Sequence, residues 1–194
     1  MIVLASRSTT RISLMQNAGL KFDVEVARID ERKIEEENSQ IGYTQFELTA
    51  KLAEAKALSV SENHPQAFVV GADQTLHIND SYLHKPADIG TLKAQLDLLR
   101  GKTHMLCSAV CVAHNNKIVW QHQGLAQMTM HDFTDQERDL VMELEGNQLL
   151  QSVGGYRLEG PSIRLFEQIQ GDYFTVLGLP LLPLLSALRE LKAI

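Results

Sequence analysis

Short strand-like runs and longer helical runs alternate along the whole chain. The apolar or alternating runs that fit strands include residues 2–5, 22–26 and 67–72. The segments with apolar residues on one helical face include 44–62, 88–100 and 181–192. Residues 22–26 alternate apolar and acidic side chains, which predicts a half-buried strand, whereas the other two strand-like runs are apolar enough to be buried.

The second half of the chain carries turn signals between its strands. Two long strand patterns, 103–113 and 117–130, flank Asn115 and Asn116, a pair typical of a hairpin turn. Thr134 and Glu137 match a capping box that opens a helix. Runs at 163–168 and 174–177 predict a final strand pair. The order of these segments indicates an α/β fold with a mixed twisted sheet flanked by helices.

Bulk composition limits the classes of protein to which the chain can belong. Its 194 residues fit a single domain over residues 1–194, and 44% hydrophobic with 22% charged residues is ordinary for a globular protein. A formal net charge of -6 without a dense Lys/Arg cluster argues against a nucleic-acid partner. Apolar stretches fall short of the ~20 residues of a membrane span, so no membrane association is expected.

Two cysteines, Cys107 and Cys111, lie inside one apolar run. In an extended strand they would share a face about 13 Å apart, at roughly 3.3 Å per residue. Because a disulfide needs a much closer approach, we expect two buried free thiols. Free thiols fit a reducing compartment, and we therefore expect a cytoplasmic protein.

A polar segment follows the first predicted strand and leads into a helix. It contains Ser6, Ser8 and Arg11. A helix N-terminus offers unpaired N–H groups, so two hydroxyls and a guanidinium there predict a phosphate cradle. Ordinary capping of the helix would explain the serines equally well.

An acidic residue, Asp73, follows the apolar run 67–72. We expect it at the carboxyl edge of the sheet, directly after a strand, where ligands of α/β proteins bind. A carboxylate there can bind Mg²⁺ or take a proton from water. The alternative is an aspartate that caps a turn.

Two further loops carry candidate ligand contacts. Pro86 restricts Lys85 to an extended conformation, from which its ammonium could meet a phosphate oxygen. Glu159 stands among Gly154, Gly155 and Gly160, which suggests a loop shaped around a ligand. An exposed loop lysine and a tight glycine turn are the plain alternatives.

Taken in order, these segments resemble the Maf family over nearly the whole chain. The family's opening Leu-Ala-Ser-x-Ser-Pro-Arg-Arg corresponds to residues 4–11, with Thr9 and Thr10 in place of Pro and Arg. Its Gly-Ala-Asp corresponds to residues 71–73. The remaining matching segments are 84–86, 99–104, 153–160 and 171–180.

The resemblance implies a role for each candidate residue, within an inosine-triphosphatase-like architecture that has a central cleft. It implies that Asp73 is the catalytic acid–base and that Glu31 is its partner near a metal, so both are expected metal ligands. Lys85 is expected in the catalytic set. The implied substrate contacts are Ser6, Arg11, Lys56, Lys85 and Glu159, with Ser8 joining them through the predicted cradle.

The function that the resemblance implies is hydrolysis of a nucleoside triphosphate to a monophosphate and pyrophosphate, with Mg²⁺ or Mn²⁺, to clear non-standard or excess nucleotides. A non-catalytic nucleotide-binding regulator of septum formation is the alternative, and a phosphatase that releases phosphate is a third. The preferred base stays open among thymidine, uridine and modified purines, although Glu159 in place of Gln points away from the first two. The family also implies a homodimer.

Overall fold

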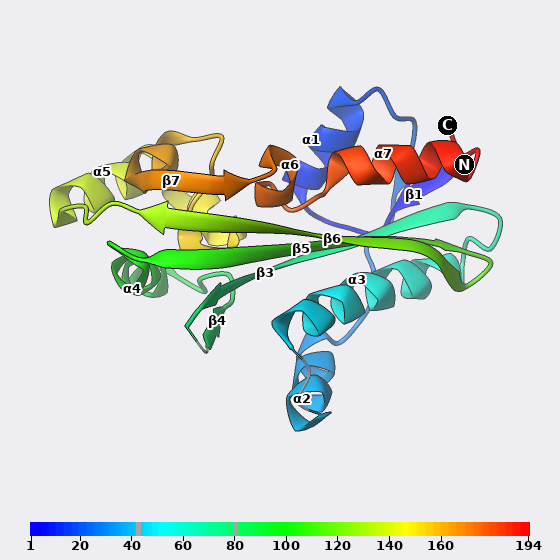
Figure 1. Ribbon diagram of the computed structural model, residues 1–194, viewed down its shortest axis with the longest axis horizontal. Coiled ribbons are helices and arrows are strands. Elements are labelled where there is room, and N and C mark those ends of the chain that lie inside the picture. Colours follow the sequence, from blue (N-terminus) through cyan, green and yellow to red (C-terminus); the bar gives the residue numbers. More distant parts are fainter. Residues whose placement is uncertain (42–43, 80) are drawn as a thin grey trace. The chain divides into compact units, whose positions relative to one another are not determined.

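Parallel and antiparallel strands share one sheet in the computed structural model, which describes residues 1–41, 44–79 and 81–194. The strands are β1 (Ile2–Leu4), β2 (Asp23–Val24), β3 (Phe68–Ile78), β4 (Ser81–Leu83), β5 (Thr103–His114), β6 (Lys117–Met130) and β7 (Phe166–Gly171). Their order is β2-β1-β3-β5-β6-β7, and β4 pairs with β3 (Figure 1). Strand β1 is parallel to β2 and β3, whereas β4 and β7 are antiparallel to their partners. The predicted mixed sheet is confirmed.

Seven α-helices and three 3₁₀ turns lie between the strands and at their ends in the described part of the chain. The helices are α1 (Thr9–Asn17), α2 (Glu31–Ile41), α3 (Gln45–Ser61), α4 (Ile89–Leu99), α5 (Asp135–Glu145), α6 (Tyr173–Val176) and α7 (Leu181–Glu190). The 3₁₀ turns are η1 (Gly146–Gln151), η2 (Val153–Gly155) and η3 (Pro161–Leu165). The described helices do not include one with the length and apolar character that a membrane span needs.

Contacts divide the chain into two compact units. Unit 1 comprises Met1–Gln74, Cys107–Gly124 and Asp172–Ile194, and unit 2 comprises Thr75–Leu106 and Leu125–Gly171. Strands β3, β5 and β6 contribute residues to both units, so the division falls within strands rather than at a linker. The expectation of a single domain over residues 1–194 stays a prediction.

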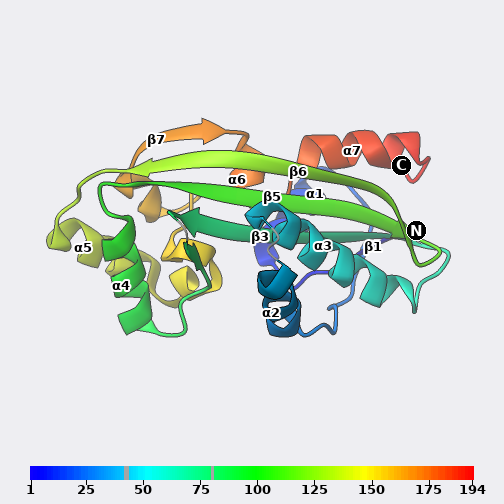
Figure 2. The same cartoon turned by 60° about the horizontal axis from the view of Figure 1, so that its bottom comes forward.

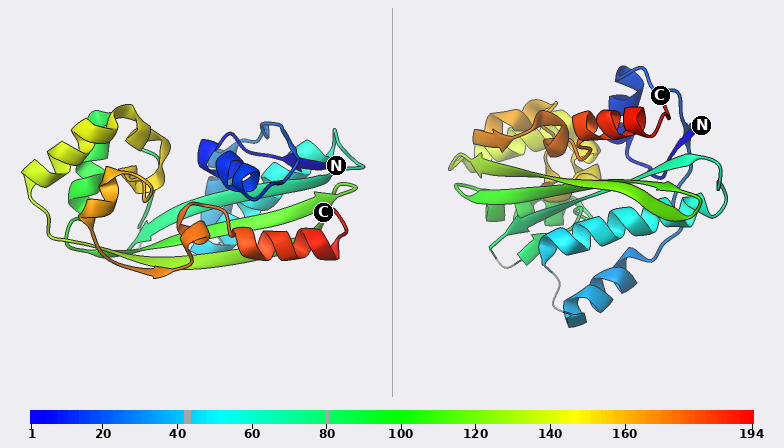
Figure 3. Two further views of the ribbon diagram at one scale, coloured as in Figure 1. Left: turned by 90° about the horizontal axis from the view of Figure 1, so that it is seen from above. Right: turned by 45° about the vertical axis from the view of Figure 1, so that its right-hand side comes forward.

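Unit 1 has helices on both faces of its strands. Figure 1 shows α3 on one face and α1 and α7 on the other, and Figure 2 shows α2 beside α3. The two ends of the chain lie close together in this unit (Figure 3). The predicted strand at 22–26 is shorter than expected, because only Asp23 and Val24 pair with β1, and both side chains are exposed.

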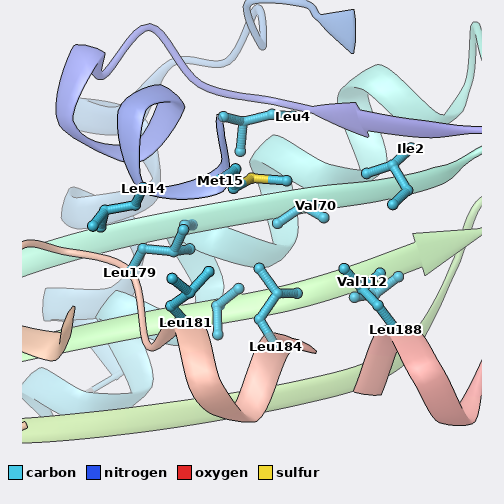
Figure 4. Packing of buried hydrophobic residues seen from close by; sticks show 12 residues of the cluster. Ile2, Leu4, Leu14, Met15, Val70, Val112, Leu179, Leu181, Leu184 and Leu188 are labelled. Atoms are coloured by element: carbon cyan, nitrogen blue, oxygen red, sulfur yellow. The ribbon is translucent and has the colours of Figure 1, made fainter. Parts of the chain in front are cut away.

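Apolar side chains from β1, β3, β5, α1 and α7 form the core of unit 1 on one face of the sheet (Figure 4). In α7, Leu181, Leu184 and Leu188 repeat at helical spacing and are buried against the strands. Cys107 and Cys111 are buried free thiols, as predicted. Burial raises the pKa of the Cys111 thiol to about 12, which keeps it protonated and unreactive.

On the opposite face, α3 approaches β3 unusually closely. A Cβ atom added to Gly71 would lie 2.3 Å from the carbonyl oxygen of Ala53 and 2.7 Å from the Cβ atom of Ala57. A glycine in the strand and alanines in the helix therefore let the two backbones meet. The helix begins at the capping box of Thr44 and Glu47, which fixes the start of α3.

In unit 2, an ion-pair network joins α4 to α5. The guanidinium of Arg138, whose side chain is 1% exposed, lies 2.5 Å from Asp97 and 2.7 Å from Asp139. Arg100 bridges Asp97 and Asp135 at 2.5 and 2.6 Å. A buried cation of this kind needs several carboxylate partners to offset its desolvation.

The chain after α5 differs from the predicted strand pair. Residues 161–165 form the turn η3, and β7 then pairs with β6. The second predicted strand is instead the short helix α6, because the Asp172 side chain accepts the Thr175 N–H at 2.8 Å and caps it. Residues 174–177 have an apolar pattern that suits both structures, and the cap decides between them.

Buried His104 of unit 2 should make the protein acid-sensitive. Its Nε2 lies 2.7 Å from the Tyr156 hydroxyl, and burial lowers the pKa of His104 to about 4 from an ordinary value of 6.5. Between pH 6.5 and pH 4, His104 binds a proton in the unfolded chain but stays neutral in the folded chain. The free energy of unfolding should therefore fall by up to about 3 kcal/mol across this window.

Urea denaturation at pH 7 and pH 4.5 measures this loss. We expect His104→Gln to lose less stability than the wild type between these two pH values, since glutamine can still bond Tyr156 but does not titrate. Burial also lowers the pKa of His77 to about 4, so part of the acid sensitivity should remain in the variant. An equal loss in both proteins would contradict the assignment to His104.

Candidate active site

The loop between β1 and α1 brings together Ser6, Ser8 and Arg11 of the predicted cradle. Ser8 is the N-cap of α1, and its hydroxyl accepts the Arg11 N–H at 3.4 Å. The Ser6 hydroxyl accepts the Ser8 N–H at 3.2 Å and an Arg11 Nη1–H at 3.4 Å. The capping role of Ser8 is thus real, and the hydroxyl of Ser6 lies beside a guanidinium.

Arg11 also holds three parts of unit 1 together. Its Nη1 donates to the carbonyl oxygen of Ala72 at 2.9 Å, and its Nε donates to that of Gly178 at 2.8 Å. Burial lowers the pKa of Arg11, while the nearby charges of Asp73 and Glu31 oppose that shift. The side chain stays charged because its ordinary pKa is so high. Arg11 therefore places a positive charge at the end of β1 and fixes the backbone around it.

Helix α3 supplies a cation between two carboxylates. The Nζ atom of Lys56 lies 2.5 Å from Oδ1 of Asp73 and 2.9 Å from Oε1 of Glu31. The side chains of Lys56 and Asp73 are 13% and 12% exposed, whereas that of Glu31, at the first position of α2, is 50% exposed. The structure thus brings together three predicted site residues from two helices and a strand.

The sequence suggested that Asp73 follows a strand, but Asp73 lies inside β3. The sequence pattern predicts only the apolar part of β3 as a strand. After this apolar part the strand continues to Ile78, because its last residues pair with β4. Parallel pairing of β3 with β1 ends at Leu4 and Val70. Asp73 therefore lies past the carboxyl end of β1. The sequence placed Asp73 at the carboxyl end of its own strand, β3, but the strand end beside it is that of β1.

Gln74, next to Asp73 in β3, is a residue that the sequence reasoning left without a role. Its Nε2 donates to Oγ of Ser108 at 3.0 Å and to the carbonyl oxygens of Thr175 and Val176 at 3.1 and 3.0 Å. Successive side chains of a strand point to opposite faces, so Gln74 binds α6 while Asp73 faces α3. The feature that could have drawn attention to Gln74 is its polar side chain inside an otherwise buried strand.

The other two predicted site residues, Lys85 and Glu159, belong to unit 2. Lys85 follows β4 in the chain and precedes Pro86. Glu159 Oε1 lies 3.7 Å from Nη2 of Arg157. Gly154 and Gly155 have φ values of 77° and 70°, which favour glycine, as a tight turn requires.

A divalent cation fits the donor set of unit 1. Residues 1–41, 44–79 and 81–194 contain no group of three His, Cys, Asp or Glu side chains arranged as metal ligands. Mg²⁺ needs no such group, since it is commonly bound by one or two carboxylates together with water and substrate phosphates. Glu31 and Asp73 already share one cation, the Lys56 ammonium, and their oxygens are hard ligands of the kind that Mg²⁺ or Mn²⁺ prefers.

Comparison with known proteins identifies the family. A family model described as "Maf-like protein" matches residues 1–191, and the chain belongs to this family. A "7-methyl-GTP pyrophosphatase" of Brucella abortus biovar 1 (strain 9-941) is 47% identical over 193 residues, covering 100% of this chain and 97% of the relative. A protein of the same name from Rhizobium johnstonii (strain DSM 114642 / LMG 32736 / 3841) is 46% identical, with the same coverage.

A "nucleoside triphosphate pyrophosphatase" of Rhodopseudomonas palustris (strain BisB18) is 44% identical over 190 residues, covering 97% of this chain and 93% of the relative. Among solved structures, a nucleoside-triphosphatase (dITP/XTP pyrophosphatase) of Mycobacterium abscessus is 14% identical with a TM-score of 0.39, covering 76% of this chain and 95% of that one. This last similarity is too distant to support an argument about the site.

Proposed function

We propose that the protein is a nucleoside triphosphate pyrophosphatase that hydrolyses 7-methyl-GTP to 7-methyl-GMP and pyrophosphate. One observation carries the chemistry: Asp73, Lys56 and Glu31 meet within hydrogen-bonding distance next to the cationic β1–α1 loop, in a chain of the Maf family. The names of relatives up to 47% identical over the whole chain support the substrate.

In the proposed mechanism, Asp73 orients a water molecule and takes its proton as the water oxygen attacks the α-phosphorus. The bond from the α-phosphorus to the bridging oxygen breaks, and pyrophosphate leaves with that oxygen. Lys56 and Arg11 stabilise the negative charge that develops on the phosphates, and Lys85 is proposed to join them. A Mg²⁺ or Mn²⁺ ion held by Glu31 and Asp73 would neutralise phosphate charge and polarise the phosphoryl group.

The base preference is proposed from the names of the relatives and from Glu159. Methylation at N7 leaves guanine with a positive charge, which a carboxylate favours and which a neutral amide side chain does not. Glu159 is such a carboxylate, and it follows the glycine turn of Gly154 and Gly155 in the chain. Two buried free thiols support the proposal that the enzyme works in the reducing cytoplasm.

A panel of triphosphates tests the proposal. We expect kcat/KM for 7-methyl-GTP to exceed that for GTP, dTTP, UTP and CTP by at least about 10-fold, the factor for a difference of 1.4 kcal/mol. The assay should separate pyrophosphate from phosphate and use Mg²⁺ and Mn²⁺ in parallel. Release of phosphate would indicate a phosphatase, and a nucleotide-dependent rise in melting temperature without any product would indicate a non-catalytic binder.

A further inference from the structure

The two carboxylates proposed to hold the metal already share a cation that belongs to the protein. Lys56 Nζ contacts one oxygen of Asp73 at 2.5 Å and one of Glu31 at 2.9 Å. We propose that Lys56 is a resident counter-cation, which competes with the divalent ion for these carboxylates and leaves them only when a triphosphate offers its own oxygens. This inference rests on the proposed function and makes metal and nucleotide bind cooperatively.

The charge balance of the site supports the competition. Glu31 and Asp73 carry two negative charges, and Lys56 and Arg11, whose charge interacts with both carboxylates, carry two positive ones. A divalent ion that arrives alone would therefore face an already neutral cluster and two nearby cations. A triphosphate supplies the missing negative charge, so the metal–nucleotide complex should bind far better than either component alone.

The geometry lets Lys56 change partners without any movement of the fold. Its backbone is fixed because α3 meets β3 at Gly71, where an added Cβ atom would clash with Ala53. The lysine ammonium is a compact charge on a flexible four-carbon stem, so it can turn from a carboxylate to a phosphate while the helix stays in place. Asp73 and Glu31 would then become free to bind the metal.

Titration of the free protein with Mn²⁺ tests the proposal without any turnover. Removal of the ammonium in Lys56→Met should raise the affinity for Mn²⁺ alone by at least about 10-fold. Lys56→Arg keeps a cation and should stay within about 3-fold of the wild type. Lys51→Met is the matched control, because Lys51 lies on the same helix and pairs with Glu54 at 3.0 Å. Its affinity for Mn²⁺ should not change.

The cooperativity can be measured in the wild type itself, so this test does not depend on whether a variant folds. Binding of an α,β-methylene analogue of GTP should raise the affinity of the wild type for Mn²⁺ by at least about 10-fold, and this gain should be several-fold smaller in Lys56→Met. Thermal unfolding gives a second readout, since a saturating ligand stabilises the folded state, and Mn²⁺ alone should raise the melting temperature of Lys56→Met more than that of the wild type.

Equal affinity of wild type and Lys56→Met for Mn²⁺ would overturn the counter-cation role, and so would a wild type whose affinity for Mn²⁺ ignores the nucleotide analogue. Neither result depends on hydrolysis, so the proposed activity would stand on the substrate panel. Conversely, a panel that yields no product would remove the proposed enzyme, while the Mn²⁺ titration would still report whether Lys56 competes for the carboxylates.

Discussion

Asp73→Asn should hydrolyse its nucleoside triphosphate at least about 10²-fold more slowly than the wild type, the usual effect of losing general-base catalysis. Asparagine keeps the shape of the side chain and an oxygen that can accept the Lys56 hydrogen bond, which is 2.5 Å long in the wild type. It loses the negative charge and the ability to take a proton from water. The fall should appear in kcat at saturating nucleotide and metal.

Asp88→Asn is the matched control for this substitution. Asp88 caps α4 in unit 2, where its side chain accepts the Thr91 N–H at 2.7 Å. Asparagine is as good an N-cap as aspartate, so the helix should be unaffected. We expect the turnover of Asp88→Asn to match that of the wild type. A similar turnover in Asp73→Asn would remove Asp73 from the mechanism.

Gly71→Ala should unfold far more easily than the wild type and lose activity with its stability. The new methyl group would lie 2.3 Å from the carbonyl oxygen of Ala53 and 2.8 Å from the backbone nitrogen of Ala57. Because backbone atoms cannot turn aside, α3 must move away from β3. Overpacking of this kind costs about 3 kcal/mol, which corresponds to a fall of roughly 6–12 °C in melting temperature for a protein of this size.

The displaced helix also carries Lys56, so kcat/KM should fall even at temperatures where Gly71→Ala is folded. Gly90→Ala is the control, since the nearest atom to its new Cβ would be a carboxylate oxygen of Asp88 at 3.4 Å. Gly90 lies in α4, where alanine is the better helix former, and the melting temperature should stay equal or rise. A normal melting temperature in Gly71→Ala would show that α3 can move without cost.

Local patterns in the sequence predicted most elements because their causes are local. The capping boxes of Thr44 with Glu47 and Thr134 with Glu137 open α3 and α5, although only the second had been recognised in the sequence. Asn115 and Asn116 have φ values of 49° and 57°, as a tight hairpin turn requires. The helix α6 was missed although its cap, Asp172, is equally local, because an apolar run of four residues has no distinct period.

The sequence by itself determined most of the strands and helices, the buried thiols and the set of polar residues worth examining. Only the tertiary structure decided that Lys56 reaches Asp73, that Arg11 is bonded to the carbonyl oxygen of Gly178, 167 positions away, and that Asp73 lies inside a strand. Periodicity and capping depend on neighbours along the chain. Contacts of side chains with distant segments depend on strand pairing and on how closely a helix can approach a sheet, which no single segment encodes.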